Sequence, residues 1–319
     1  MKVFKHIVNW IIWTAIGLYA IVMLAIHTPW VQRQMGNKVS EIVGKKLGTK
    51  VEVGRIDLGF LNRLILDSVI IYDQKSQPML QVARMTAKMD MAPLAVGRIH
   101  ISSAQVFGAK LRLERPTADA PTNFQFVLDS LVSKDTTSHT PLDLRINSFI
   151  MRRSAVSYDQ WDIAPTEGKF NPQHVNLQDI SAHVILKVLK DDSLNISVKR
   201  LTFLEHSGLN VQHLAFHLTA GNQDAALHDF QLQLPKSSIN IDSITASYNQ
   251  KQLEESLRFK GRIANTSITP SDLQFIIPQL ENYNHRIAVS TDFLYENQQL
   301  TVPHFQAESN HHDLSLKAN

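Results

Sequence analysis

The chain of 319 residues contains no cysteine. Disulfide bonds, thiolate metal sites, iron–sulfur clusters and cysteine nucleophiles are therefore excluded together. This absence is compatible with either side of a cell membrane, and it argues against a small secreted domain held by disulfides. Charge is also scarce: Asp, Glu, Lys and Arg make up 19% of the residues, and the formal net charge is only +3. Neither the charge nor any basic run indicates a nucleic-acid partner.

Motifs for catalysis are missing as well. Residues 44–46 (Gly-Lys-Lys) resemble the end of a phosphate-binding loop, but Val39 replaces the upstream glycine and no Ser or Thr follows. Residues 205–207 (Glu-His-Ser) have the types found in a hydrolase triad, yet neighbours on a strand diverge, which favours an exposed strand end. Among 14 histidines, His213 and His217 lie on an expected strand, about 13 Å apart and too far for one zinc ion. We expect no enzyme activity, no cofactor and no metal.

The longest apolar run, residues 7–26, carries no charge. A helix of this length spans roughly the 30 Å of a bilayer core. Lys2 and Lys5 precede the run, so the positive-inside rule predicts a cytoplasmic N-terminus and a body on the far side. The rival interpretation is a cleaved signal peptide, whose apolar core is usually about 7–15 residues and ends in a small-x-small site. Because this run is longer and is followed by bulky His27 and Trp30, we expect an uncleaved single-pass anchor.

Helical periodicity continues after the anchor. Thr28 and Pro29 fit an N-cap followed by proline at the first helical position, and Gly48 lies where a C-terminal cap glycine belongs. Between them, apolar residues recur on one stripe from Val31 to Leu47. Two interpretations remain open for this amphipathic helix: it lies on the membrane surface, or it docks on the following sheet.

From Lys50 onward, apolar residues recur at every second position, which is the period of a β-strand. Residues 99–113 and 142–158 each keep one phase for about three times the 5–6 residues usual for a strand. Few helices are available to cover such a sheet, so the pattern predicts a mainly β chain with long antiparallel strands in a curved, trough-like sheet. The candidate residues lining an apolar groove are Ile99, Ile101, Phe107, Leu111, Leu113, Leu142, Leu144, Ile146, Ile150, Val184 and Leu186.

The expected organisation has five parts. A short helix is expected from Asn123, and another from Thr269. The chain stops inside an alternating pattern, and we interpret it as the N-terminal part of a longer protein. The parts are the cytoplasmic N-terminus with the anchor (1–27), the amphipathic helix (28–48), a first β segment (49–115), a linker with a short helix (116–141) and a continuing β groove (142–319).

Several segments resemble a known family. The order of anchor, amphipathic helix and β segment is similar to the N-terminal region of AsmA-like proteins, most closely those of the TamB type. The likeness covers essentially the whole chain, but its motifs are turns, caps and apolar alternation rather than chemistry, and the C-terminal TamB domain is missing. The segments are LGTKVEVGRIDL (47–58), LILDSVIIYD (64–73), LAVGRIHI (94–101), NFQF (123–126), LPKSS (234–238) and SDL (271–273).

The resemblance implies an inner-membrane protein whose body lies in the periplasm of a Gram-negative envelope. Such proteins form a β trough whose apolar channel holds phospholipid acyl chains, and they are associated with moving phospholipid toward the outer membrane. The resemblance also implies an alternative: a translocation and assembly factor for outer-membrane proteins that acts with an Omp85-type (TamA-like) partner. The alternating faces favour the lipid conduit, because an assembly factor needs unpaired strand edges. An anchored scaffold without cargo is a third interpretation.

Overall fold

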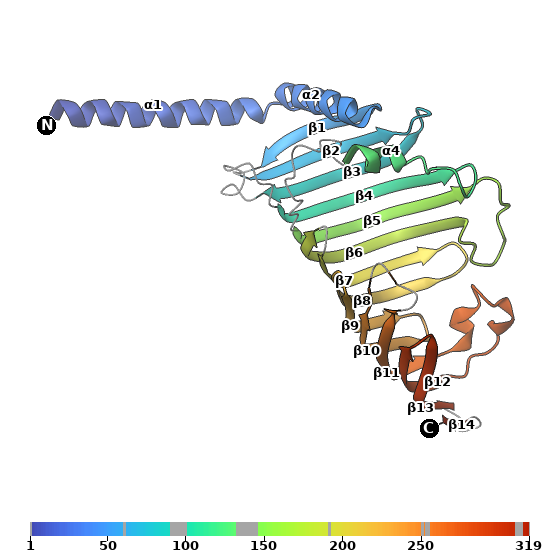
Figure 1. Ribbon diagram of the computed structural model, residues 1–319. Helices are drawn as coiled ribbons and strands as arrows, with labels where there is room; N and C mark the ends of the chain where they lie inside the picture. Colours follow the sequence, from blue (N-terminus) through green and yellow to red (C-terminus); the bar gives the residue numbers. More distant parts are fainter. Residues whose placement is uncertain are drawn as a thin grey trace.

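The computed structural model describes residues 2–59, 62–89, 101–131, 146–190, 193–249, 252, 256–309 and 315–318. These residues form one sheet of 14 strands, hydrogen-bonded in the order of the sequence (Figure 1). The expectation of a mainly β chain with few helices and an open, curved sheet is confirmed. The strands are β1 (Val51–Gly59), β2 (Arg63–Tyr72), β3 (Pro78–Met89), β4 (Ile101–Arg115), β5 (Ile146–Gln160), β6 (His174–Lys190), β7 (Ser193–Glu205), β8 (Asn210–Ala220), β9 (Asp224–Gln233), β10 (Ser238–Ser247), β11 (Arg258–Ile268), β12 (Ile287–Glu296), β13 (Gln299–Ser309) and β14 (Ser315–Ala318).

Neighbouring strands run antiparallel, except that β4 and β5 are parallel. The connection between these two contains the short helix α4 (Gln125–Leu131). Because β4 pairs directly with β5, the expected first β segment and the continuing groove belong to one sheet. The helix expected from Thr269 is instead two short 3-10 turns, η2 (Pro270–Leu273) and η3 (Pro278–Leu280).

Two long helices precede the sheet. α1 (Lys2–Ile26) has 25 residues and contains the run expected to span a membrane. Within the described ranges, no helix is both long enough and apolar enough to cross a bilayer, so the anchor stays a prediction. α2 (Pro29–Leu47) begins at the expected proline and is capped by Gly48, whose φ of 67° is left-handed.

Helix α2 docks on the sheet at its first strand. The apolar stripe between Met35 and Leu47 packs against a buried cluster on β1–β4. The backbone N–H of Val53 donates a hydrogen bond to Ser40 Oγ at 2.9 Å, so the helix satisfies a polar group of this edge strand. Of the two interpretations of the amphipathic helix, the structure favours docking on the sheet. Covering an edge in this way hinders the addition of another strand there.

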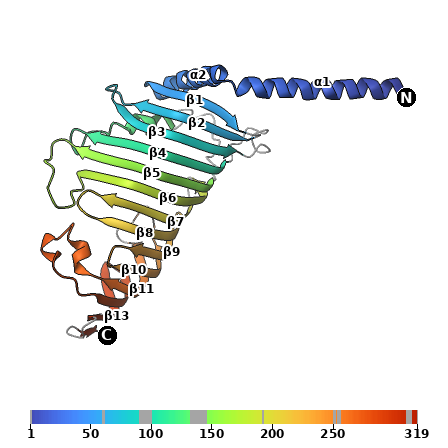
Figure 2. The ribbon, with the colours of Figure 1, turned by 180° about the vertical axis from the view of Figure 1, so that it is seen from behind.

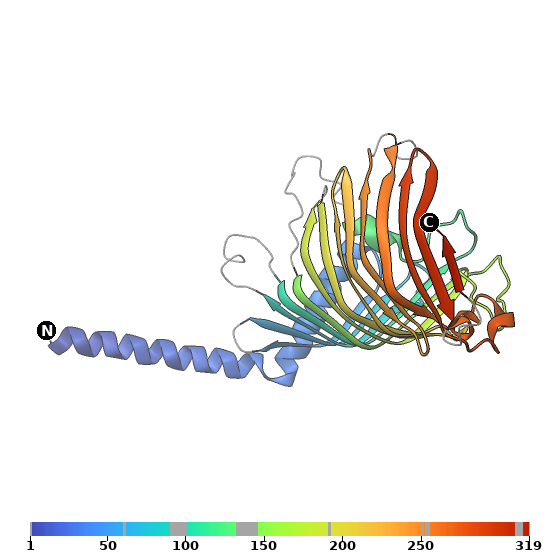
Figure 3. The same cartoon turned by 90° about the horizontal axis from the view of Figure 1, so that it is seen from below.

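A line of irregular positions crosses the sheet near the middle of its strands. Ser68, Gly108, Arg153 and Asp179 have positive φ angles of 55°, 63°, 51° and 52°. The pairing register is interrupted at or beside each of them. Irregularities of this kind bend a strand and increase its twist. Figure 3 shows the result: the strands are bowed along their length, and α2 and α4 lie on the hollow side of the bend.

The same positions change the phase of the side chains. Val106 and Ala109 are three residues apart, yet both belong to the buried cluster beneath α2. Phe107, between them, lies on the opposite face. A residue with positive φ forms a bulge in the strand, and the side chains after it alternate between the faces one position out of step with those before it. The expectation that residues 99–113 and 142–158 each keep one phase is therefore wrong.

Candidate functional site

The sheet has one apolar and one polar face. Residues paired in register on neighbouring strands point to the same side, so each face can be followed from strand to strand. We call the side on which α2 packs the inner face and the other side the outer face. Three rows of the inner face are Ile71–Leu80–Leu111–Val156–Leu177, Val184–Val198–Phe216 and Leu218–Leu227–Ile244–Gly261–Phe293.

The outer face is polar along the same strands, and Figure 2 shows no described helix lying across it. The two phases of a strand therefore differ in chemistry, with apolar exceptions such as Phe107 on the outer face, and pairing in register carries the difference from strand to strand. Two rows of the outer face are Asp67–Arg84–Phe107–Arg152 and Ser197–His217–His228–Ser243–Arg262–Asp292–His304.

The inner face is covered at one end only. Beneath α2, Ile56 is 2% exposed and Val82 is 4% exposed. From β6 to β13, most inner-face side chains are only partly buried, as with Leu218 and Leu227. In the part of the chain that the structure describes, only neighbouring strands pack extensively against β6–β13. This open stretch of the inner face is the candidate functional site.

The expected groove lining is divided between the two faces. Leu111, Leu113, Val184 and Leu186 lie on the inner face, as their register partners show. Phe107 and Ile150 lie on the outer face, where they pair with Arg152 and Gln105, so placing them in the groove was wrong. The physical reason is the phase change at Gly108 and Arg153. Ile101 and Ile146 pair through their backbones, whereas Ile99, Leu142 and Leu144 lie outside the described residues.

Several inner-face residues were not among the expected lining. Phe216 stacks on Phe230 with ring centroids 6.5 Å apart, and Phe259 stacks on Tyr295 at 4.8 Å. Their strands are shorter and change phase midway, so each half gives only a brief alternating signal. The positive-φ residue Asp229 is the kind of position at which the alternation restarts one residue out of phase.

Charge on the outer face is organised around Asp67. Arg84 Nε donates to one carboxylate oxygen at 2.6 Å, and Arg55 Nη2 donates to the other at 2.6 Å. The hydrogen bond from Arg84, followed by that from Arg55, lowers the pKa of Asp67 below its usual value. This cluster is a surface ion-pair network that fixes β1, β2 and β3 against one another.

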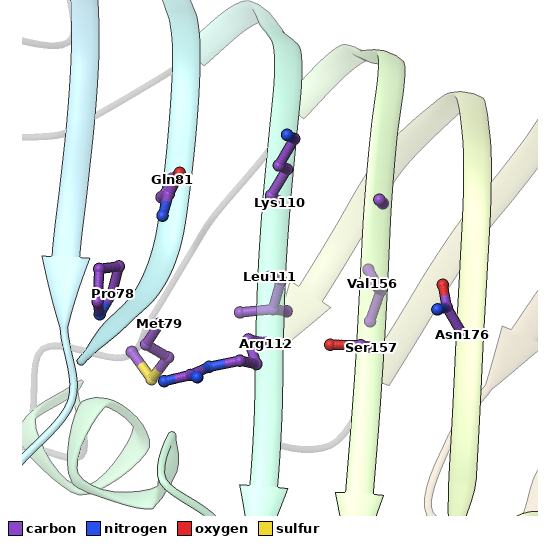
Figure 4. A pocket seen from close by; sticks show the side chains of 10 residues that line it. Pro78, Met79, Gln81, Lys110, Leu111, Arg112, Val156, Ser157 and Asn176 are labelled. Carbon is purple, nitrogen blue, oxygen red and sulfur yellow. The ribbon is translucent and has the colours of Figure 1, made fainter. Parts of the chain in front are cut away.

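A shallow hollow of about 400 Å³ is also found on the outer face, across β3–β6 (Figure 4). Its lining is mixed, with polar groups from Gln81, Lys110, Arg112, Ser157 and Asn176 beside apolar residues such as Met79. Arg112 Nη2 lies 3.8 Å from the buried carboxylate of Asp73. Because the hollow is shallow, is lined by two cations and lies on the side opposite the apolar face, it is unsuited to acyl chains.

Two histidines of the outer face lie close together. His217 and His228 face each other across β8 and β9 with ring centroids 6.4 Å apart, but no three His, Asp or Glu residues in those ranges gather as metal ligands. No protein-family model, curated protein or solved structure matches this chain. Function is therefore inferred from the geometry of the faces.

Proposed function

We propose that this chain is an inner-membrane-anchored periplasmic protein that carries phospholipid between the inner and outer membranes along its inner face. The observation that carries the proposal is the continuous apolar face that remains partly open to solvent from β6 to β13. A contiguous exposed apolar surface of this kind marks a binding surface. Each methylene moved from water onto such a surface gains roughly 0.8 kcal/mol, so acyl chains suit it.

The shape of the surface favours lipid over protein cargo. An acyl chain is long, flexible and apolar along its length, and it needs no hydrogen bonds from the surface that holds it. An unfolded protein strand needs an unpaired edge with which to form backbone hydrogen bonds. At β1 the edge is covered by α2, and Ser40 occupies the N–H of Val53. The alternative function is that of an assembly factor for outer-membrane proteins that acts with an Omp85-type partner.

The anchoring part of the proposal rests on α1. Its exposed side chains include Trp10 at 72%, Ile21 at 65% and Leu24 at 72%. Large apolar side chains exposed around a helix are stabilised by a lipid environment. Lys2 and Lys5 favour the cytoplasmic side for the N-terminus, which leaves the trough in the periplasm.

Photo-crosslinking at neighbouring positions tests the conduit. A photoreactive residue replacing Leu227 on the inner face should capture phospholipid in cells. The same residue at His228, one position along on the outer face, should not. The two positions lie at the same depth along the trough and differ only in the face of the sheet on which the side chain lies. Capture of phospholipid at both positions, or of unfolded outer-membrane protein at Leu227 alone, would contradict the lipid conduit.

A further inference from the structure

The small net charge of the chain hides a separation of charge along the sheet. Strands β3–β7 contain eleven Lys or Arg and only four Asp or Glu. Strands β8–β10 contain three Asp and no Lys or Arg. One segment of the trough is therefore strongly basic and the next is acidic.

The basic segment presents its cations to solvent. We call six of these cations the basic band. All six are exposed, and none of them makes an ion pair with another described residue. Elsewhere on the outer face arginines are neutralised, as where Arg258 lies 3.3 Å from Glu296. Two of the four acids in these strands are also engaged: Glu205 is buried, and Asp159 is hydrogen-bonded to His174. The basic band comprises Lys88, Lys110, Arg152, Arg153, Lys199 and Arg200.

Register places four cations of the band on the outer face, whereas Arg153 and Lys199 have no register partner and fall at the shifts beside Arg152 and Arg200. Lys110 pairs with Ala155, Arg152 with Phe107, and Arg200 with His183, all on the side away from α2. Figure 4 shows Lys110 projecting from β4 beside the neighbouring strands. Since neighbouring strands are about 4.8 Å apart, the cations from β4 to β7 cover roughly 15 Å of surface.

The composition of the band indicates the kind of partner. A protein interface is organised around an apolar or aromatic centre, but on the described parts of β3–β7 the only exposed large hydrophobic side chain is Leu204, near the end of β7. A phosphate-rich bilayer needs only clustered cations, and Arg binds phosphate oxygens in a bidentate manner. We propose that the basic band is a docking surface for the anionic headgroups of a phospholipid bilayer. This surface is separate from the apolar inner face and does not depend on lipid moving along it.

Binding to supported bilayers tests the band. The full chain is held in phosphatidylcholine nanodiscs, so that α1 is occupied, and is passed over bilayers of phosphatidylcholine with or without about 30% phosphatidylglycerol. Binding should need phosphatidylglycerol and should fall at least about tenfold between roughly 50 and 300 mM NaCl, because salt screens exposed charges. The triple variant K110E/R152E/R200E should lose at least about tenfold in affinity.

A matched variant separates position from total charge. K75E/K169E/K260E reverses three exposed lysines outside the band and changes the net charge by the same amount. It should bind almost as the unmodified chain does, and both variants should melt at the same temperature. Equal loss in both variants, or equal binding to both bilayers, would overturn the proposal. Binding to soluble polyglutamate without any preference for phosphatidylglycerol would assign the band to an acidic protein instead. Crosslinking at Leu227 tests the lipid conduit on the inner face, and its result does not depend on any of these outcomes.

Discussion

The two ends of the inner face carry the same apolar pattern but stand in different surroundings. Under α2, residues such as Val53 and Val69 are 7% and 6% exposed and form a core. From β8 to β10, residues in equivalent positions are only partly buried, and among the described elements only neighbouring strands pack extensively against them. Alternation therefore specifies which side of a strand is apolar, whereas the presence of a covering helix decides whether that side becomes a buried core or stays partly open to solvent.

A charge in the covered region should have the largest effect. Val69→Asp places a carboxylate among the apolar side chains of the buried cluster and should lower the free energy of unfolding by at least about 3 kcal/mol. Chemical denaturation followed by circular dichroism measures the loss. If Val69→Asp costs less than about 1 kcal/mol, α2 does not seal this end.

The same change in the open region should be milder for folding. Leu232→Asp lies on the inner face of β9, paired with Leu214 and Ile239, where water can reach the carboxylate. We expect a loss of about 1–2 kcal/mol in the free energy of unfolding, with the fold retained. Gln231→Asp, exposed on the outer face of the same strand, should change it by less than about 0.5 kcal/mol. An unfolded Leu232→Asp chain would indicate a closed core there as well.

The phase change between the faces can be tested at Gly108. Its φ of 63° is unfavourable for other residues, and a Cβ there would lie 3.1 Å from Ala83 Cβ. Gly108→Ala should therefore cost about 1–2 kcal/mol of stability. Gly168 has a similar φ of 67°, but a Cβ added there would meet no atom within 4 Å, so Gly168→Ala should cost less. An equal loss of stability in the two variants would mean that the close approach of residue 108 to β3 does not add to the cost of the substitution.

The smallest expected effect is a pH dependence at the rim of the trough. His174 Nδ1 lies 2.9 Å from Asp159 Oδ1, and its Nε2 lies 2.7 Å from the Ile163 carbonyl. The hydrogen bond with Asp159, and then that with the carbonyl, raises the pKa of His174. The resulting stabilisation is complete below the unfolded-state pKa of about 6.5 and is lost as pH rises through the higher folded-state value. His174→Gln should flatten this part of the stability–pH curve, and an unchanged slope would contradict the assignment.

Much of the architecture could be predicted from the sequence. Period-two alternation after Lys50 and the scarcity of helices indicated a curved open sheet, and Gly48 was correctly expected to cap α2. The faces of individual residues were less predictable, because a positive-φ residue such as Arg153 has no distinctive sequence signal. Leu111 was therefore placed correctly and Phe107 was not. The basic band was missed because its cations come from separate strands and form no run.

The most direct test of the lipid conduit is the phospholipid content of the purified chain. After gentle detergent extraction, phospholipid per chain is measured by mass spectrometry for the unmodified chain, Leu232→Asp and Gln231→Asp. We predict bound phospholipid in the unmodified chain and in Gln231→Asp, and a loss of most of it in Leu232→Asp, because a carboxylate on the inner face opposes acyl chains. Equal phospholipid in all three chains, or none in any of them, would contradict the proposal that the open inner face holds lipid.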